Sequence, residues 1–255
     1  MASPSIHDSS AAVRRNVCVF GTVSFFNDTA SEMAYWILPA FLASLGAGPA
    51  AIGLIEGIAE SVASLGKLFS GYLTDTVQRR KPIVVFGYLL ANLVKPFLAL
   101  SMRWWQVLFI RFADRTAKGL RATPRDVMLA ESVDPKTIGR TYGLLQSMDS
   151  AGAIAGPLIA WLVIARTGNM RWVFWLAAVP GAIAVLVVLL AKETRHERIR
   201  REPATSPVGP VRLSRRFYYM LFAVLIFSLG NSSDMFLVLR AQQIGISPRM
   251  APVLG

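Results

Sequence analysis

The chain has 255 residues, of which 54% are hydrophobic and 16% are charged, and its mean hydropathy is +0.47. This composition is too apolar for a water-soluble chain of that length and is typical of a helical protein with several membrane spans. The formal net charge of +12 comes from basic residues in short runs between apolar segments, which indicates membrane topology and argues against a nucleic-acid-binding surface.

Residue types that carry common enzymatic chemistry are scarce in this chain. Cys18 is the only cysteine, and the two histidines, His7 and His196, lie outside the apolar segments. The chain therefore lacks the cysteine pairs that disulfides and thiolate zinc sites need, and it has no histidine in the apolar segments for catalysis. We expect no enzymatic activity, no metal site and no cofactor.

Seven apolar runs are near or above the roughly 20 residues that a helix needs to cross a bilayer. In chain order, these runs cover residues 17–45, 50–73, 82–102, 104–130, 143–166, 172–191 and 217–239. An eighth run begins around Met250. The first run is too long for the hydrophobic region of a signal peptide and contains acidic residues, so we expect it to remain as an uncleaved span.

Basic residues gather on one side of the predicted spans. Arg15, the run from Arg79 to Lys81 and the segment 192–216 fall on that side, whereas only a few, such as Arg103 and Arg171, fall on the other. The positive-inside rule therefore predicts a cytoplasmic N-terminus and a cytoplasmic 192–216 segment. This segment is the one long hydrophilic interruption, and its basic run is expected to be a solvated loop beside anionic lipid.

The first predicted span carries two acidic residues, Asp28 and Glu32, near its middle. A carboxylate at the centre of a spanning helix costs roughly 3 kcal/mol on insertion scales, so two of them one turn apart indicate a functional pathway. They share a helix face with Gly21, Ser24 and Tyr35. Because the two carboxylates repel each other when both are ionised, we expect at least one to gain and lose a proton at working pH.

Charged residues also occur in the next predicted spans. Glu56 and Glu60 share a face of the second span, where they either extend the acidic stripe of the first span or pair with Lys95 of the third. At about 1.5 Å per residue, Arg111 in the fourth span falls between Asp28 and Glu32 in height. Arg111 could therefore pair with whichever of these acids is ionised.

The connection after the second span resembles motif A of the major facilitator superfamily. It reads GYLTDTVQRRK, with Gly71, Asp75, Arg79 and Arg80 at the spacing of that motif. In the family, this loop latches the two halves of the protein in one state. The resemblance therefore implies a gating role for Asp75 and Arg79.

The fourth and fifth spans resemble two further motifs of the same superfamily. RFADRTAKG is similar to motif B, with Arg111 at the intramembrane arginine position and Asp114 and Arg115 in place of a glutamine and a glycine. The fifth span is similar to motif C, which is associated with antiporters and particularly with drug exporters. Its matching residues are Gly143, Gly152, Gly156 and Pro157.

The three motifs occur in order on the expected spans, and the resemblance implies a fold. In this family, an all-α six-helix bundle is built of two inverted three-helix repeats, and two such bundles rock around a central cavity. We therefore expect residues 1–191 to form an N-terminal six-helix transmembrane bundle and residues 192–216 a cytoplasmic basic linker. Residues 217–255 would hold a seventh span and the start of an eighth, the first part of an incomplete C-terminal bundle.

The function implied by this resemblance is secondary transport in a bacterial inner membrane. The stretch FFNDTASEM, for example, is similar to a bacterial branch of uncharacterised permeases. We expect export of a small organic compound in exchange for protons, with Asp28 and Glu32 carrying the proton, Arg111 as the counter-charge, and Glu56 and Glu60 along the same pathway. The expected partners are the substrate, protons, the lipid bilayer and a second bundle, supplied by the rest of the protein or by another chain.

The sequence is also compatible with other functions. The protein could be an importer or uniporter of an organic anion that binds Arg111, Arg115 and Lys95, or a half-transporter without transport activity. A seven-span receptor or retinal protein is disfavoured, because the N-terminus is predicted inside and the seventh span has no lysine for a Schiff base.

Overall fold

The computed structural model of the chain describes residues 6–77, 79–193, 213–230, 233–247, 250 and 252. The described residues form helices, turns and connections and contain no strand, which confirms the predicted all-α class. The predicted eighth run, from about Met250, lies almost entirely outside the described residues.

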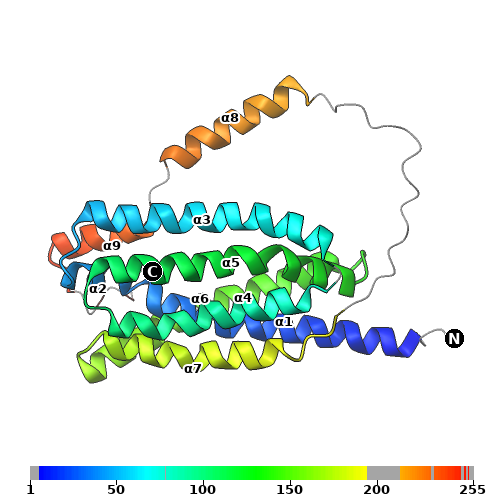
Figure 1. The fold of residues 1–255 in the computed structure, drawn as a ribbon, viewed down its shortest axis with the longest axis horizontal. Coiled ribbons are helices and arrows are strands. Elements are labelled where there is room, and N and C mark those ends of the chain that lie inside the picture. Colours follow the sequence, from blue (N-terminus) through cyan, green and yellow to red (C-terminus); the bar gives the residue numbers. More distant parts are fainter. Residues whose placement is uncertain are drawn as a thin grey trace.

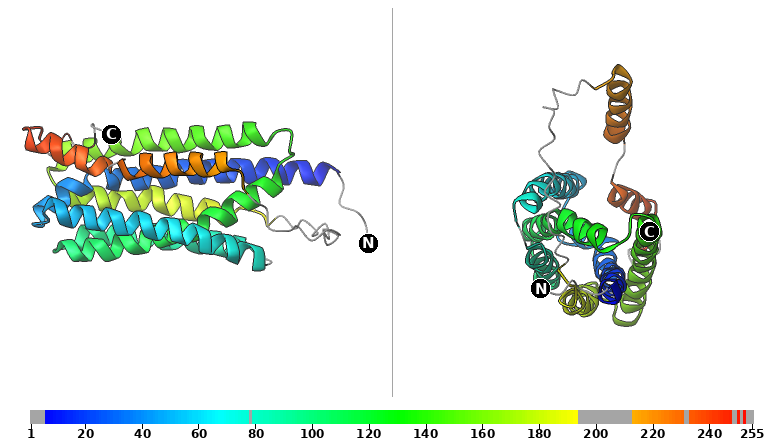
Figure 2. Two further views of the ribbon diagram at one scale, coloured as in Figure 1. Left: turned by 90° about the horizontal axis from the view of Figure 1, so that it is seen from above. Right: turned by 90° about the vertical axis from the view of Figure 1, so that its right-hand side faces the viewer.

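Long helices that lie side by side occupy the first six predicted spans (Figure 1). They are α1 (Ile6–Tyr35) followed by α2 (Leu38–Ser44), α3 (Pro49–Thr76), α4 (Lys81–Val94) followed by the 3-10 helix η1 (Lys95–Leu100), α5 (Trp104–Ser132), α6 (Ile138–Thr167) and α7 (Arg171–Val188). Figure 2 shows these helices end-on, packed as one bundle.

By length and composition, three of the described helical segments could cross a membrane: Lys81–Leu100, Ile138–Thr167 and Arg171–Val188. Helices α1, α3 and α5 are also long, with 30, 28 and 29 residues, but they carry the intramembrane charges noted in the sequence. In a helical membrane protein, such residues face the bundle interior or a water-filled cavity. The charged helices are therefore expected to line the interior of this bundle.

Two predicted spans are interrupted by proline. The first is divided between α1 and α2, where Pro39 cannot donate a backbone hydrogen bond to the carbonyl of Tyr35. The third changes from α-helix to 3-10 helix at Lys95, because Pro96 likewise leaves the carbonyl of Asn92 without its helical donor. Both interruptions lie beside the charged interior of the bundle.

The interval predicted as the seventh span holds two helices, α8 (Arg215–Gly230) and α9 (Asp234–Gln243). Ser233 begins α9 by accepting a hydrogen bond from the backbone N–H of Met235 at 3.3 Å, and this N-cap starts a new helix. Helix α8 stands apart from the bundle and is exposed along its described side chains, whereas α9 packs on α2 and α3 (Figures 1 and 2).

The contacts inside the bundle repeat. Helix α1 packs mainly on α6 and α7, and α5 packs mainly on α3 and α4. Helix α1 is the first of the first three spans and contacts the second and third helices of the other set, α6 and α7. Helix α5 is the first of the second three spans and likewise contacts α3 and α4. This is the pattern expected of two inverted three-helix repeats.

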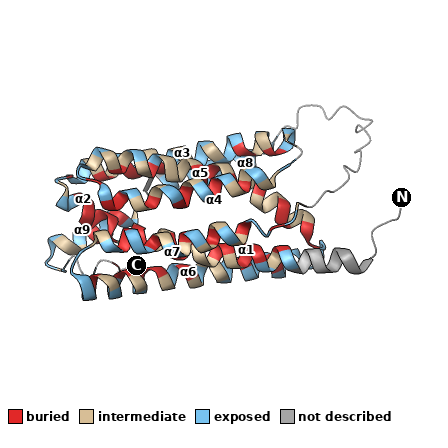
Figure 3. Cartoon of the chain, turned by 60° about the horizontal axis from the view of Figure 1, so that its bottom comes forward, coloured by how far each residue is buried: buried red, intermediate tan, exposed pale blue. Residues whose placement is uncertain are grey.

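Two hydrophobic clusters form the core, and both take side chains from α1, α5, α6 and α7. One surrounds Met33, Ile55 and Phe174, and the other surrounds Phe20 and Tyr88. Figure 3 shows buried and exposed residues alternating along the same helices. Between the two clusters, α1 and α5 contribute polar residues in place of apolar ones, and these residues form the candidate site.

Candidate functional site

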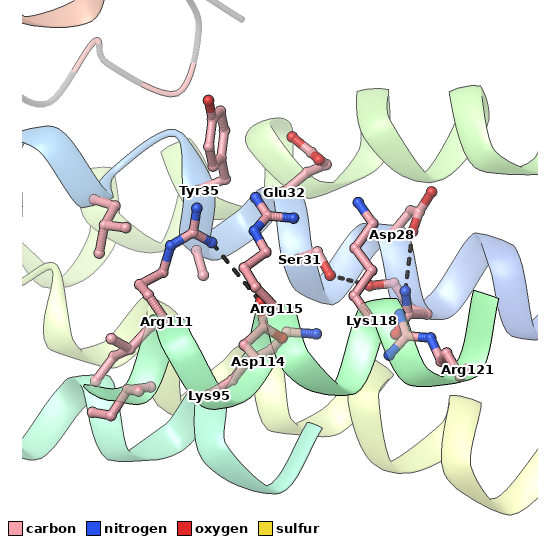
Figure 4. A pocket seen from close by; sticks show the side chains of 15 residues that line it. Asp28, Ser31, Glu32, Tyr35, Lys95, Arg111, Asp114, Arg115, Lys118 and Arg121 are labelled. Atoms are coloured by element: carbon pink, nitrogen blue, oxygen red, sulfur yellow. Dashed lines mark hydrogen bonds and ion pairs between the residues drawn. The ribbon is translucent and has the colours of Figure 1, made fainter. Parts of the chain in front are cut away.

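A polar cavity of about 80 Å³ lies between α1, η1 and α5, which is room for a few water molecules. Figure 4 shows side chains of α1 and α5 entering the same space. The residues that line the cavity are Asn27, Asp28, Ser31, Glu32, Ala34, Tyr35, Leu38, Lys95, Leu98, Ile110, Arg111, Asp114, Arg115, Lys118 and Arg121. Three of them are acidic and five are basic.

The two acids of the first span, Asp28 and Glu32, both line this cavity and are half-buried. Asp28 accepts a hydrogen bond from the side-chain amide of its neighbour Asn27, with 3.0 Å between Nδ2 and Oδ1. Neither carboxylate forms an ion pair with any of the described residues. Both carboxylates thus lie in the cavity without a cationic partner among the described residues.

Arg111 does not pair with either acid of α1. Its guanidinium binds the carboxylate of Glu56 on α3, with 2.9 Å between Nη2 and Oε2, and both side chains are buried. Asp114 lies at 3.9 Å from Arg111, and the ring of Tyr35 lies 5.6 Å from its guanidinium carbon. The expectation that Arg111 pairs with Asp28 or Glu32 is therefore wrong for this conformation, because α3 offers a carboxylate at bonding distance.

A second ion pair lies one turn further along the same two helices. Arg115 is 3.5 Å from Glu60, whose side chain is 65% exposed. The expected pairing of Glu56 and Glu60 with Lys95 is therefore wrong, because Arg111 and Arg115 of α5 are their partners. These two pairs join α3 to α5.

Close glycine contacts bring α6 onto α1 at the two cavity acids. A Cβ atom on Gly152 would lie 2.5 Å from the carbonyl oxygen of Phe25 and 3.2 Å from Cβ of Asp28. A Cβ atom on Gly156 would lie 2.8 Å from the carbonyl oxygen of Thr29 and 2.9 Å from Cβ of Glu32. Two of the motif C glycines therefore set the distance between α6 and the helix that carries the acids.

We expect Gly156→Ala to lower the free energy of unfolding by roughly 1–3 kcal/mol, because the added methyl group overpacks the contact with α1. Gly143→Ala is the matched control in the same helix, since a Cβ atom there meets nothing within 4 Å. In an exposed helical position, the alanine is expected to stabilise by about 0.5–1 kcal/mol. Denaturant unfolding in detergent micelles measures both, and equal changes would contradict the packing role of Gly156.

The motif A residues lie at the end of the bundle predicted to be cytoplasmic. Asp75 and Arg79 are exposed and form no ion pair with a described residue, and Gly71 has open space around it. Arg80 pairs with Glu131 of α5 at 2.5 Å. Pro157 lies buried within α6, which continues through it.

Glu193 joins the same end of the bundle and was not singled out from the sequence. Its carboxylate accepts hydrogen bonds from the backbone N–H groups of Arg80 and Lys81 at 2.7 and 3.0 Å, where α4 begins. A carboxylate at a helix N-terminus satisfies free donors and complements the helix dipole. Asn27, which lines the cavity, and the buried Asn92, which donates a hydrogen bond to it, were also missed, although polar amides inside predicted spans could have indicated them.

The known proteins that resemble this chain include transporters. A family model described as Major Facilitator Superfamily matches residues 20–255. The chain is 34% identical over 238 residues to an uncharacterized MFS-type transporter of Methanocaldococcus jannaschii, covering 93% of this chain and 59% of that protein. It is 28% identical over 192 residues to the multidrug resistance protein MdtH of Photorhabdus laumondii, covering 74% and 47%.

The fold also matches solved transporter structures. A bacterial homolog of the human lysosomal transporter Spinster, in an inward-facing and occupied conformation, aligns with a TM-score of 0.69 at 16% identity, covering 96% of this chain and 56% of that chain. The chain thus spans less than two thirds of the length of each of these proteins.

Proposed function

Because the chain belongs to the Major Facilitator Superfamily, whose members are transporters and not enzymes, we propose that the whole protein exports a small organic compound in exchange for protons by alternating access. The observation that carries this proposal is the state of Asp28 and Glu32. Both carboxylates line the cavity without an ion pair to a described residue, while the neighbouring Arg111 is already paired with Glu56. The multidrug resistance proteins among the relatives support export.

The exchange follows from the spacing of the two acids. Asp28 and Glu32 lie one helical turn apart, so ionising one disfavours ionising the other. Protons that enter from the outer side neutralise the pair, and a substrate with a positive or hydrogen-bond-donating group displaces them from the inner side. Lys118 of α5 lines the same cavity, so the negative charge left by proton release has a cation in the same space.

Membrane placement and gating belong to the same proposal. The N-terminus lies in the cytoplasm of a bacterial cell, and the bundle sits in the inner membrane. The pair of Arg80 with Glu131, near the motif A residues Asp75 and Arg79, holds the cytoplasmic end of the bundle in one state. A second bundle, from a longer protein or another chain, supplies the opposite wall of the substrate pathway.

Transport by the whole protein is expected to follow an imposed pH gradient. In proteoliposomes loaded with ethidium as the probe, an inwardly directed proton gradient should drive ethidium out of the vesicles. Nigericin, which collapses that gradient, should stop this efflux. Liposomes without protein provide the control. Ethidium movement that survives collapse of the pH gradient would contradict proton exchange.

One observation favours a second candidate, the uptake of an organic anion. The Nε atoms of Arg111 and Arg115 are buried and have no hydrogen-bond partner among the described residues, so two donors are available to a carboxylate. The two candidates differ in what the acids do. Export by exchange requires Asp28 and Glu32 to release protons as substrate binds, whereas in anion uptake the acids only compensate the charge of the basic residues that bind the anion.

A further inference from the structure

Lys95 is a buried lysine whose position is not explained by the proposed exchange. Only 4% of its surface is exposed, and it lies where α4 changes to η1 beside Pro96. A buried ammonium group is costly unless it is paired, yet Lys95 forms no ion pair with a described residue within 4 Å. Its hydrogen-bond partner is Asn92, whose Oδ1 accepts from Nζ at 3.0 Å.

This contact starts a directed chain of hydrogen bonds. An ammonium group only donates, so it fixes Oδ1 of Asn92 as the acceptor and turns Nδ2 away from itself. Nδ2 donates to the carbonyl of Tyr88 at 2.9 Å and to Oδ1 of Asn27 at 3.4 Å. The Nδ2 atom of Asn27 then donates to Oδ1 of Asp28 at 3.0 Å. Along the path from Lys95 to Asp28, each donor lies on the Lys95 side of its bond, while the bond from Asn92 to Tyr88 stays within α4.

Helix α7 leaves room for this chain. A Cβ atom on Gly181 would lie 2.7 Å from Oδ1 and 3.0 Å from Cγ of Asn92. A larger residue at that position would therefore push the amide out of the contact with Lys95. The amide chain thus occupies space that three helices, α1, α4 and α7, leave between them.

We propose that Lys95 is a positioning residue for Asp28, and that its ammonium group orients the amides of Asn92 and Asn27 so that one N–H stays on the Asp28 carboxylate. The proposal rests on the proposed role of Asp28 as a proton carrier. A charged donor at one end and a carboxylate at the other polarise the bonds between them, which strengthens each of them. Lys95 therefore favours the ionised form of Asp28 and promotes release of its proton.

Other charges surround the two ends of the chain. The charged residues that act on Lys95 are Asp114, Arg121, Arg115 and Asp28 itself. The charged residues that act on Asp28 include Glu32 of its own helix, Lys118 of α5 and Asp149 of α6. A direct effect of charge must therefore be separated from an effect transmitted by the amides.

Two variants make this separation. Lys95→Met removes the charge and the donor, whereas Asn92→Leu keeps the charge and removes the amide chain. In the whole protein reconstituted in lipid, infrared difference spectra recorded against pH follow the C=O stretching band of the protonated Asp28 carboxyl group, identified as the band that Asp28→Asn removes. We expect both variants to move the pH profile of this band by about one pH unit towards higher pH.

Two controls frame the result. Lys95→Arg keeps a charged donor and is expected to retain most of the original pH profile. Lys67→Met removes a lysine charge at an exposed position of α3 and is expected to leave the pH profile unchanged. If Asn92→Leu leaves the profile in place, Lys95 acts through its charge alone and the positioning role is overturned. If Lys95→Met behaves like Lys67→Met, Lys95 has no role in the protonation of Asp28. If no Asp28 band appears at any pH, the proton-carrying role of Asp28 fails, and the role of Lys95 fails with it.

Discussion

Replacing Asp28 and Glu32 together by Asn and Gln is expected to reduce pH-driven transport by about 100-fold or more, which is the lower range for a positioned proton-transfer group. The amides keep nearly the same shape and hydrogen-bonding capacity but cannot exchange a proton. Because Gly152 and Gly156 pack against the Cβ atoms of the two acids, and not against their carboxylates, the contact between α1 and α6 should be preserved. Proton movement coupled to probe efflux in proteoliposomes measures the loss.

The single variants and one remote acid complete this test. Asp28→Asn and Glu32→Gln alone show whether one carboxylate suffices for exchange. Asp134→Asn removes an acid from the exposed connection between α5 and α6, and it is expected to leave transport unchanged. Proton-driven transport that persists in the double variant would mean that neither carboxylate carries the proton.

Glu56→Gln is expected to lower the free energy of unfolding by about 3–5 kcal/mol, because it leaves the buried guanidinium of Arg111 without its carboxylate partner. Asp114 is already 3.9 Å away and compensates only in part. Glu60→Gln is the matched comparison, since Glu60 pairs with Arg115 on the same two helices but is 65% exposed.

Removing that exposed pair is expected to cost at most about 1 kcal/mol. Denaturant unfolding of both variants in detergent micelles, with the free energies compared to the unchanged protein, measures the difference. Equal losses would contradict the idea that burial decides the importance of the pair, and a stable Glu56→Gln variant would show that Arg111 finds another partner.

The sequence predicted the bundle well because each helix obeys a local rule. Apolar runs of spanning length and short polar connections placed all six helices of the first bundle. The proline interruptions changed their ends: Pro39 separates α2 from α1, and Pro96 converts the end of α4 into η1. The break between α8 and α9 was missed, because mean apolarity over 217–239 does not register a serine N-cap at Ser233.

The site was predicted in composition but not in pairing. Asp28, Glu32 and Arg111 do line one cavity, as a count of residues along the spans implied. Counting gives height in the bundle, whereas pairing depends on how each helix is rotated and how closely its neighbours approach. The approach of α3 to α5, where a Cβ atom on Gly119 would lie 2.9 Å from Cα of Gly66, brings Glu56 to Arg111, and no single-helix pattern contains that information.

The repeated contacts of the bundle give its two halves the same backbone scaffold but not the same electrical character. The α1 wall of the cavity carries carboxylates with no counter-ion among the described residues, and the α5 wall carries guanidinium groups together with the ammonium of Lys118. If the protein is the exporter proposed above, we expect a dipolar substrate to turn its positive end towards Asp28 and Glu32. The two three-helix repeats thus share one backbone arrangement, and a few charged side chains make the cavity between them electrically asymmetric.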